Sequence, residues 1–339
     1  MKVSVVMAVY NGDRYLQEAI ESILNQTFTD FEFILIDDGS TDATESILTA
    51  YAKQDSRILV SRNNENMGLP RSLNKGLALA QGEYVARMDA DDISLPKRFA
   101  KQVAFMDAHP EVGVCGTWLK TIGEAPGYEQ YPVEDKTIRA WLLFDSALAH
   151  PSVMMRRKLF VQENLHYDPA YKYCQDYELW GRASTKFLIN NLPEYLIIYR
   201  VHPQQMGQSY SEQLRLSEIK NVQQIQLHNL SIKPTDEDLD LHLCFKILRF
   251  SATKEFFKLA HGWLEKLKAE NEKSSAYDQL ALTNILGYRW YLLCQAATNL
   301  GWSSWETFWQ SPFSASTNLS WQQKLKFAIK CGIKWKGQI

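Results

Sequence analysis

Hydrophobic positions over the first 120 residues follow two alternating periodicities. Residues 3–8 and 31–36 are largely apolar runs rich in Val and Ile, which is typical of strands buried on both faces. Between these runs, the apolar residues of segment 13–25 recur at the three- and four-residue spacing of an amphipathic helix. The pattern therefore predicts a β-α-β unit.

The same alternation continues as far as residue 118. It predicts strands at residues 58–61, 84–88 and 113–118 and helices at residues 70–80 and 96–108. Alternating strands and helices of this kind build a mostly parallel sheet with helices on both faces. We therefore predict an α/β, Rossmann-like fold for the N-terminal part of the chain.

The pattern becomes mixed after residue 137 and helical after residue 206. The mixed region indicates the second half of the same domain, and beyond it apolar residues recur only at helical spacing. We expect two domains, an α/β domain at residues 1–205 and a helical, Trp-rich region with a basic tail at 206–339. The mixed region contains predicted helices at residues 138–144, 156–163 and 177–184 and predicted strands at 152–155 and 195–199.

The last third of the chain combines tryptophans with a basic end. Between Trp290 and Gln323 the one charged residue is Glu306, whereas residues 320–339 contain five lysines and no acid. This pattern suits peripheral contact with an anionic membrane. A packed helix with a solvated lysine face explains it as well, and both interpretations stay open. The lysines are Lys324, Lys326, Lys330, Lys334 and Lys336.

Composition narrows the class of protein. Hydrophobic residues at 45% and charged residues at 22% are typical of folded globular chains. The net charge of −2 gives no general attraction to nucleic acid, so we expect no nucleic-acid partner. Five widely spaced cysteines favour a reducing compartment. Because the sequence shows no signal peptide and no apolar run of spanning length, we expect a cytoplasmic protein, peripheral on the membrane if its C-terminus binds lipid.

Polar segments follow three of the predicted strands at the point where each strand ends. In parallel sheets, ligands bind outside the carboxyl ends of the strands. We therefore expect these segments to converge on one crevice. They are Tyr10-Asn11-Gly12, Asp37-Asp38-Gly39-Ser40-Thr41-Asp42 and Asp89-Ala90-Asp91-Asp92.

The acidic segment at residues 89–92 indicates metal chemistry most clearly. Carboxylates at a strand exit can surround one hard cation, and Mg²⁺ or Mn²⁺ typically combines one or two carboxylates with phosphate oxygens. An EF-hand is excluded because Ser94 and Ala100 stand where that loop needs glycine and glutamate. Acidic triplets in loops are often solvated surface, but the preceding apolar strand favours a metal site for a diphosphate ligand.

Three other segments each have a structural and a binding interpretation. Residues 37–42 suit a turn and a helix cap at Thr41 or Asp42, yet two carboxylates at a strand end also suit hydrogen bonds to a base or ribose. Residues 10–12 form a plain turn or contact a nucleobase through the Tyr10 ring. Arg71, in the first turn of a predicted helix, binds a phosphate or uracil-type edge or is simply solvated.

Asp176 and His202 are candidates for chemistry in the second half of the domain. Asp176 stands where a helix N-cap is expected, and a carboxylate there could also accept a proton from an incoming hydroxyl. His202 precedes Pro203 and is either a plain loop residue or a ligand of the metal or the pyrophosphate. His150, before Pro151, is a weaker candidate for substrate contact.

These segments, taken together, resemble the family 2 glycosyltransferases of the GT-A fold. The likeness spans residues 1–205, and its five pieces occur in the order of the family. No single piece is specific, but coincidence does not explain the set. The pieces are Val5-Val6-Met7-Ala8-Val9-Tyr10-Asn11, Ile36-Asp37-Asp38-Gly39-Ser40-Thr41-Asp42, Asn66-x-Gly68, Met88-Asp89-Ala90-Asp91-Asp92 and Gln175-Asp176-Tyr177-Glu178-Leu179-Trp180.

The resemblance implies a role for each matching residue. Asp38 would bind the base of a nucleotide-sugar, Asp89 its ribose and the metal, and Asp91 the Mg²⁺ or Mn²⁺ that bridges its diphosphate. Asp176 would be the catalytic base. The glutamate that precedes it in the family is Gln175 here, which leaves the charge around Asp176 open. Further contacts with the nucleotide-sugar would come from Val9, Tyr10, Asn11, Arg71 and Ala90.

The implied activity is an inverting transfer of one sugar per encounter. The donor would be a nucleotide-sugar, most commonly a UDP-sugar. The acceptor would be a hydroxyl of a saccharide or lipid-linked saccharide, in the synthesis of a cell-surface polysaccharide or glycolipid. The Q-x-x-R-W signature of processive members is absent from this sequence.

Two alternative functions stay open at this point. A sugar nucleotidyltransferase would also use metal-bound carboxylates, but its glycine-rich triphosphate loop is missing after residues 3–8. A nucleotide-sugar-binding or assembly protein would keep the nucleotide site, with Gln175 marking an impaired catalytic pair. Sugar transfer that disappears in Asp176→Asn while nucleotide binding is retained would distinguish the enzyme from the binder.

Overall fold

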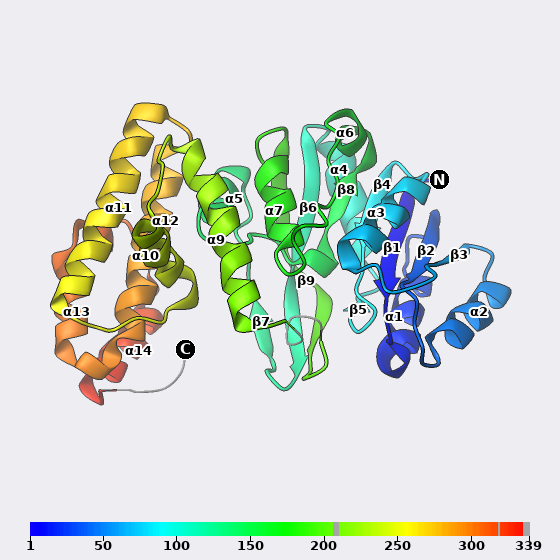
Figure 1. Cartoon of the computed structure of the whole chain (residues 1–339), viewed down its shortest axis with the longest axis horizontal. Helices are drawn as coiled ribbons and strands as arrows, with labels where there is room; N and C mark the ends of the chain where they lie inside the picture. The colour runs from blue at the N-terminus through cyan, green and yellow to red at the C-terminus, as the bar shows by residue number, and fades with distance from the viewer. Residues whose placement is uncertain (206–209, 318, 335–339) are drawn as a thin grey trace. The chain divides into compact units, whose positions relative to one another are not determined.

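One mixed β-sheet forms the centre of the N-terminal part of the chain in the computed structural model, which describes residues 1–205, 210–317 and 319–334 (Figure 1). The hydrogen-bonded order is β3-β2-β1-β4-β8-β6-β9-β5, and β7 pairs with β6. The strands are β1 (Val3–Val9), β2 (Phe31–Asp37), β3 (Ile58–Arg62), β4 (Tyr84–Arg87), β5 (Ile93–Ser94), β6 (Val112–Gly123), β7 (Gly127–Glu129), β8 (Met154–Arg156) and β9 (Leu188–Val201).

Parallel pairing dominates the half of the sheet that contains the N-terminus. β1 pairs in parallel with both β2 and β4, and β2 pairs in parallel with β3. β6 and β9 are also parallel, whereas β8 and β5 run antiparallel to their neighbours. The predicted fold class, a mostly parallel α/β sheet flanked by helices, is confirmed.

Helices connect the strands and then make up the rest of the chain. α3 begins at Leu69 with Pro70 in its first turn, which suits the fixed φ of proline. The helices are α1 (Asp13–Leu24), α2 (Thr44–Gln54), α3 (Leu69–Leu79), α4 (Arg98–Ala108), α5 (Asp135–Leu142), α6 (Arg157–Gln162), α7 (Gln175–Ala183), α9 (Glu212–Asn229), α10 (Asp236–Ile247), α11 (Lys254–Ser274), α12 (Gln279–Ala296), α13 (Trp302–Gln310) and α14 (Trp321–Gly332).

Several predicted boundaries differ from the structure. The predicted strand at residues 152–155 begins only at Met154, because His150–Ser152 forms a single 3-10 turn in which the Ser152 hydroxyl donates to Ala149 O at 2.8 Å. β6 and β9 are longer than predicted. The structure also contains the short strand β7 between β6 and α5, where the sequence predicts no helix or strand.

The chain divides into two compact units. The first contains Met1–Ile138 and Ser146–Glu218, and the second contains Arg139–Asp145 and Ile219–Ile339. This division into compact units does not show which residues bind ligands. The predicted boundary at residue 205, between an α/β domain and a helical region, therefore stays a prediction.

Each unit has its own hydrophobic core. In the first unit the core consists of residues from β1, β2 and β4 and the inner faces of α1 and α4, including Val5, Phe33 and Phe99. In the second unit it consists of residues from the helices, including Trp263 and Trp290, and of Phe144 in the turn after α5. None of the helices in the described part of the chain is long and apolar enough to cross a membrane.

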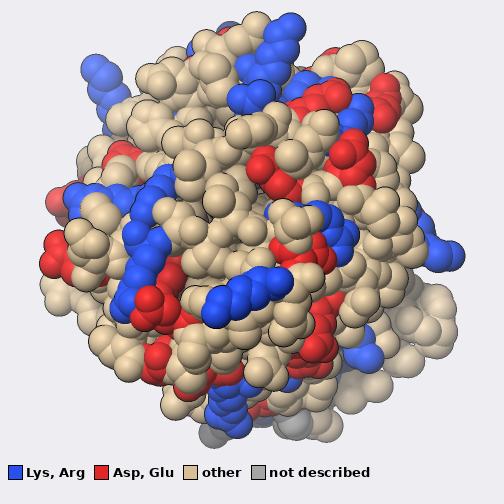
Figure 2. Space-filling model, turned by 90° about the vertical axis from the view of Figure 1, so that its right-hand side faces the viewer, with Lys and Arg blue, Asp and Glu red and all other residues tan. Residues whose placement is uncertain are grey.

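Figure 2 shows one face of the molecule with its charged side chains coloured. Basic and acidic residues are interspersed over this face, and no large area carries a single sign of charge. This mixture agrees with the near balance of 37 basic and 39 acidic residues in the sequence.

Candidate functional site

The loops after β1 and β2 are locked together at the carboxyl end of the sheet. The backbone N–H of Asn11 donates to Ser40 Oγ at 3.0 Å, and the N–H of Thr41 donates to Asn11 Oδ1 at 2.9 Å. Asn11 has φ of 49°, a left-handed conformation that asparagine tolerates better than most residues. The buried Val9 accepts from the N–H of Asp38 at 2.8 Å, while the Tyr10 side chain is exposed. Two of the predicted segments therefore meet.

Asp38 is buried, and its carboxylate organises the loop before α3. One oxygen accepts from Asn63 Nδ2 at 2.8 Å and from Met67 N–H at 2.9 Å, and the other accepts from Gly68 N–H at 2.9 Å. A carboxylate has about four acceptor positions, so about one remains for a ligand. Asp38 thus has a structural role that the sequence did not reveal, and it keeps capacity to accept about one further hydrogen bond.

Gly39 allows this loop to pack tightly. Its φ is 75°, and a Cβ at this position would lie 2.6 Å from the carbonyl carbon of Glu65. Both the left-handed backbone and the close approach require glycine. Gly39 therefore fixes the spacing between the loop after β2 and the segment that supplies donors to Asp38.

The predicted cap of the helix after β2 is displaced by one or two residues. α2 begins at Thr44 with Ala43 as its N-cap, and no side chain caps from that position. Asp42 instead accepts from the N–H of Thr44 at 3.0 Å, and its second oxygen accepts from the N–H of Asp13 at 3.2 Å. The Asp42 carboxylate thus serves the first turns of two helices, α1 and α2.

Arg71 is exposed in the first turn of α3, as the sequence predicts. No ion pair to Arg71 is present among the residues that the structure describes, so its guanidinium is not committed to a protein carboxylate. The preceding Gly68 has φ of 85°, and its N–H donates to Asp38. Arg71 therefore lies three positions after a backbone donor to Asp38, the candidate for base binding.

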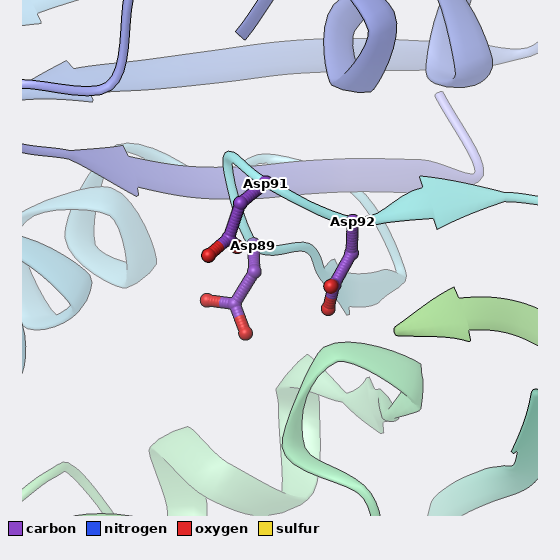
Figure 3. A group of neighbouring side chains, drawn as sticks. All are labelled: Asp89, Asp91 and Asp92. Atoms are coloured by element: carbon purple, nitrogen blue, oxygen red, sulfur yellow. The ribbon is translucent and has the colours of Figure 1, made fainter. Parts of the chain in front are cut away.

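The acidic loop follows β4, and its three carboxylates gather in space (Figure 3). Asp89, Asp91 and Asp92 each place one carboxylate oxygen within 4.8 Å of the other two. A Cβ built on Gly12 would lie 3.8 Å from the Cβ of Ala90, so the loop after β1 touches the acidic loop. The third predicted segment thus joins the other two at the same edge of the sheet.

Buried positive charge supports this acidic loop from within β4. Arg87 is buried and pairs with Asp89, and its Nε has no hydrogen-bond partner in the described structure. Burial and the charge of Asp91 raise the pKa of Asp89 despite the ion pair. Burial and the neighbouring charges of Asp89 and Asp91 raise the pKa of Asp92 well above its ordinary value. Both carboxyl groups are therefore easier to protonate than an ordinary aspartate.

The end of β9 approaches the acidic loop from another part of the sheet. His202 Nε2 lies 2.9 Å from Asp91 Oδ2. The backbone N–H of Arg200 donates to Asp92 Oδ1 at 2.8 Å, and Arg200 Nε donates to Asp91 O at 3.0 Å. The second oxygen of Asp92 is buried without a hydrogen-bond partner among the described residues. His202 is thus brought to the predicted metal ligands.

Asp176 lies in the first turn of α7 and is not its N-cap. The N-cap is Cys174 and the helix begins at Gln175, so the predicted capping role of Asp176 is wrong. Ser146 Oγ lies 3.5 Å from Asp176 Oδ2. Burial, and to a lesser extent the charges of Asp176 and Asp89, raise the pKa of the Tyr167 hydroxyl.

Tyr167 is a buried residue that the sequence did not single out. Its hydroxyl lies 2.8 Å from His150 Nε2, and its N–H donates to Asn74 Oδ1 at 2.9 Å. Burial is the first cause that lowers the pKa of His150 well below its ordinary value, and the charge of Arg87 acts in the same direction. His150 is therefore a neutral hydrogen-bond partner of Tyr167.

The loop before α7 is held by hydrogen bonds from two side chains, Glu218 to its N–H groups and Gln175 to its carbonyl groups. Glu218 is buried and accepts from the N–H groups of Lys172, Tyr173 and Cys174 at 2.8–2.9 Å. Gln175, with its amide nitrogen toward the same loop, donates to Lys172 O at 3.1 Å and Tyr173 O at 2.9 Å. A glutamate at position 175 could not donate these bonds while ionised. The glutamine thus fits its surroundings, and Glu218 supplies a negative charge nearby.

Comparison with known proteins identifies the family. The model of glycosyl transferase family 2 matches residues 4–164. An uncharacterised glycosyltransferase of Haemophilus influenzae is 35% identical over 222 residues, which cover 62% of this chain and 69% of that protein. The chain belongs to glycosyltransferase family 2.

Two further relatives have names that state a biosynthetic context. The O-antigen biosynthesis glycosyltransferase WbnJ of Escherichia coli is 33% identical over 213 residues, which cover 59% of this chain and 80% of that protein. The amylovoran biosynthesis glycosyltransferase AmsE of Erwinia amylovora is 30% identical over 203 residues, which cover 58% of this chain and 75% of that protein.

Solved structures agree with the GT-A fold. Residues 1–349 of S. aureus TarS in complex with UDP-GlcNAc have a TM-score of 0.58 at 20% identity, covering 99% of this chain and 92% of that chain. The mannosyltransferase PcManGT from Pyrobaculum calidifontis, in complex with GDP-Man and Mn²⁺, has a TM-score of 0.50 at 15% identity, covering 99% of this chain and 88% of that chain. At these identities the likeness establishes the fold.

Proposed function

We propose that this family 2 glycosyltransferase moves one sugar from a UDP-sugar to a hydroxyl of a saccharide or lipid-linked saccharide, with inversion and with a divalent metal. The observation that carries the proposal is the group of Asp89, Asp91 and Asp92 at the end of β4, in contact with the loop after β1 and with His202. The proposal is supported further by the UDP-GlcNAc and Mn²⁺ complexes of the similar TarS and PcManGT folds.

The residues of the acidic loop fit a hard divalent cation. They offer carboxylate oxygens, which Mg²⁺ and Mn²⁺ prefer, and one buried oxygen of Asp92 lacks any partner among the described residues. The raised pKa values of Asp89 and Asp92 arise partly from repulsion that a cation would relieve. Asp91 and Asp89, with His202, would hold the ion. Bound there, it would neutralise the charge that develops on the departing diphosphate.

Of the remaining residues, one group would bind the nucleotide and Asp176 would take part in proton transfer. Asp38 would accept the N–H of the base through its unused acceptor position, with Val9, Tyr10, Asn11, Arg71 and Ala90 contacting the rest of the nucleotide. Asp176 would accept the proton of the acceptor hydroxyl while the bond from the anomeric carbon to the diphosphate breaks. Attack from the face opposite the leaving group inverts the anomeric centre.

Asp176→Asn tests the catalytic assignment. Loss of a general base typically costs 10²–10⁴-fold in rate, so we expect a drop of about 10³-fold in sugar transfer with UDP binding within about twofold of wild type. Asp236→Asn, an exposed acid of α10, is the matched control and should leave transfer unchanged. A wild type that binds UDP but neither transfers nor hydrolyses any donor would instead support the binding or assembly function.

A panel of nucleotide-sugars tests the donor and the metal. Donor hydrolysis should require Mg²⁺ or Mn²⁺, should be fastest with a UDP-sugar, and should fall at least about tenfold in Asp91→Asn through weaker metal binding. The anomeric configuration of the product, read by NMR, should be opposite to that of the donor. Retained configuration, or full activity after removal of metal by a chelator, would contradict the proposal. The names of WbnJ and AmsE make cell-surface polysaccharide precursors the first acceptors to try.

A further inference from the structure

α14 carries apolar side chains on two opposite sides. Phe327 and Cys331 face inward and are buried in the core of the second unit. Four other apolar residues stand at four-residue intervals, so they follow one another along the helix surface. They are highly exposed: Trp321 at 69%, Leu325 at 50%, Ile329 at 54% and Ile333, the C-cap residue, at 62%. We call these four residues the outer stripe.

The outer stripe lines one surface feature together with lysines. A shallow hollow runs along it, and Lys326 and Lys330 lie among the lining side chains. Trp302 of α13 is exposed as well, and its Cζ2 atom would lie 3.8 Å from a Cβ built on Gly332. At the other end of the helix, Lys324 Nζ lies 5.6 Å from the ring centre of the exposed Trp309. Trp302 thus adjoins the C-terminal end of the stripe, and Trp309 lies beside Lys324 in the first turn of α14.

Positive charge flanks the outer stripe. Residues 302–334 contain four lysines and one acid, Glu306. Partial burial, and next the charge of Lys326, lower the pKa of Lys330, which agrees with two ammonium groups close together. Among the residues that the structure describes, neither lysine forms an ion pair with an acid. A surface that combines exposed Trp, Leu and Ile with lysines on its flank matches a bilayer interface, where apolar side chains enter the acyl region and lysines meet phosphates.

We propose that the outer stripe and its flanking lysines dock the second unit onto an anionic lipid bilayer. A second copy of the chain fits this surface less well, because packing stripe against stripe would bring Lys326 and Lys330 of both copies together without acids to pair them. The proposal goes beyond the transferase activity and does not rest on it, since docking needs no donor, metal or acceptor.

Vesicle co-sedimentation of the full chain tests the docking. Vesicles of phosphatidylglycerol mixed with phosphatidylcholine should bind the protein, and phosphatidylcholine alone should bind it at least about tenfold more weakly, because one or two flanking lysines meet anionic headgroups. The double variant Leu325→Asp and Ile329→Asp should lose at least about a hundredfold in partitioning, because two buried aliphatic side chains are removed. Lys326→Gln with Lys330→Gln should lose about fivefold for each lysine.

A matched control uses exposed leucines elsewhere in the second unit. Leu259 on α11 is 64% exposed and Leu280 on α12 is 71% exposed. Leu259→Asp with Leu280→Asp should sediment with vesicles as wild type does. Equal binding of wild type and the stripe variant, or equal loss in the control, would overturn the proposal. So would a doubled mass by light scattering that Leu325→Asp abolishes, since a second copy would then cover the stripe. Transfer to a soluble acceptor should be the same in all variants, which separates this test from that of the transferase.

Discussion

Glu218 shows how one side chain can position a loop that is far away in sequence. Its carboxylate accepts three consecutive N–H groups directly before α7, the helix that carries Asp176. Three donors on one acid form a strong local restraint, because charged acceptors make shorter and stronger hydrogen bonds than neutral ones. The loop before the proposed base is thus held by a residue of α9.

Glu218→Gln tests this restraint. The amide nitrogen must face at least one backbone N–H, and a buried donor without an acceptor costs about 1–3 kcal/mol. We expect a loss of that size in the free energy of unfolding, measured in urea, and a lower kcat with little change in the KM for the donor. Glu272→Gln, at an exposed position of α11, should change neither quantity. An unchanged urea midpoint in Glu218→Gln would show that the loop is held by other contacts.

His242 is a buried neutral histidine in the second unit. It stacks on Phe144, accepts from Trp263 Nε1 at 2.9 Å and has its other nitrogen 2.9 Å from Leu143 O. Burial lowers the pKa of His242 to about 4, with the charge of Arg289 acting in the same direction. The unfolded chain therefore takes up a proton near pH 6.5, whereas the folded chain does so only near pH 4.

The stability of wild type should therefore fall between about pH 6.5 and pH 4. The unfolded state binds more protons in this window, so acidification favours it, by up to about 3 kcal/mol for this one group. In His242→Gln this part of the slope should disappear, and in the exposed His228→Gln it should remain. Urea unfolding at a series of pH values measures the difference, and parallel slopes for wild type and His242→Gln would contradict the assignment.

At the scale of elements, glycines in a tight loop and in an exposed helix have opposite effects on stability. Gly39 has a positive φ and lies against the backbone of Glu65, whereas Gly262 lies exposed in α11 with no atom within 4 Å of a built Cβ. We expect Gly39→Ala to lower both thermal stability and UDP affinity, since the loop that donates to Asp38 must move. Gly262→Ala should instead stabilise the protein by about 0.5–1 kcal/mol. Calorimetry and UDP titration measure both, and unchanged UDP affinity in Gly39→Ala would contradict this account.

The sequence predicts elements well where one face or both faces are buried. β1 and β2 are buried over nearly their whole length, so apolar residues occupy most positions and the strands are easily recognised. β7 is partly to fully exposed and, within the described part of the chain, pairs with β6 alone, so it leaves no hydrophobic pattern. Residues of the site are likewise recognised in the sequence only where they form a pattern. Asp89, Asp91 and Asp92 are visible because they are adjacent, whereas Arg87 is hidden within a strand that is otherwise apolar.

At the scale of the whole molecule, the two units have separate cores and separate candidate functions. UDP with Mn²⁺ should stabilise only the first unit, by about 2.7 kcal/mol at a hundred times the dissociation constant. Calorimetry should therefore show one transition that rises in temperature with these ligands and one that does not. Asp91→Asn should remove the rise. A single transition that moves as a whole would show that the units unfold together.

At the scale of the whole molecule, the sequence does not predict which distant segments contact one another. Glu218 lies more than forty residues after the loop that it holds, and His202 lies 111 residues after Asp91, so no local pattern links the partners. The strand-end rule predicts that polar segments meet, but it does not say which atoms pair. The lysines and tryptophans of the C-terminal region are countable in the sequence, whereas the side of α14 on which each lies is clear only from burial. Lys336 lies outside the described residues.

The seven residues Arg139–Asp145 belong to the second unit although the first unit resumes immediately after them. Gln223 Nε2 donates to Phe144 O at 2.8 Å, and the guanidinium of Arg289 lies 4.5 Å from the ring centre of Trp141. During synthesis on the ribosome, this heptapeptide emerges long before the helices that will enclose it. A gene fragment that stops after residue 218 would leave Leu143 and Phe144 without their partners, so that expressing the first unit by itself invites aggregation unless both are replaced by polar residues.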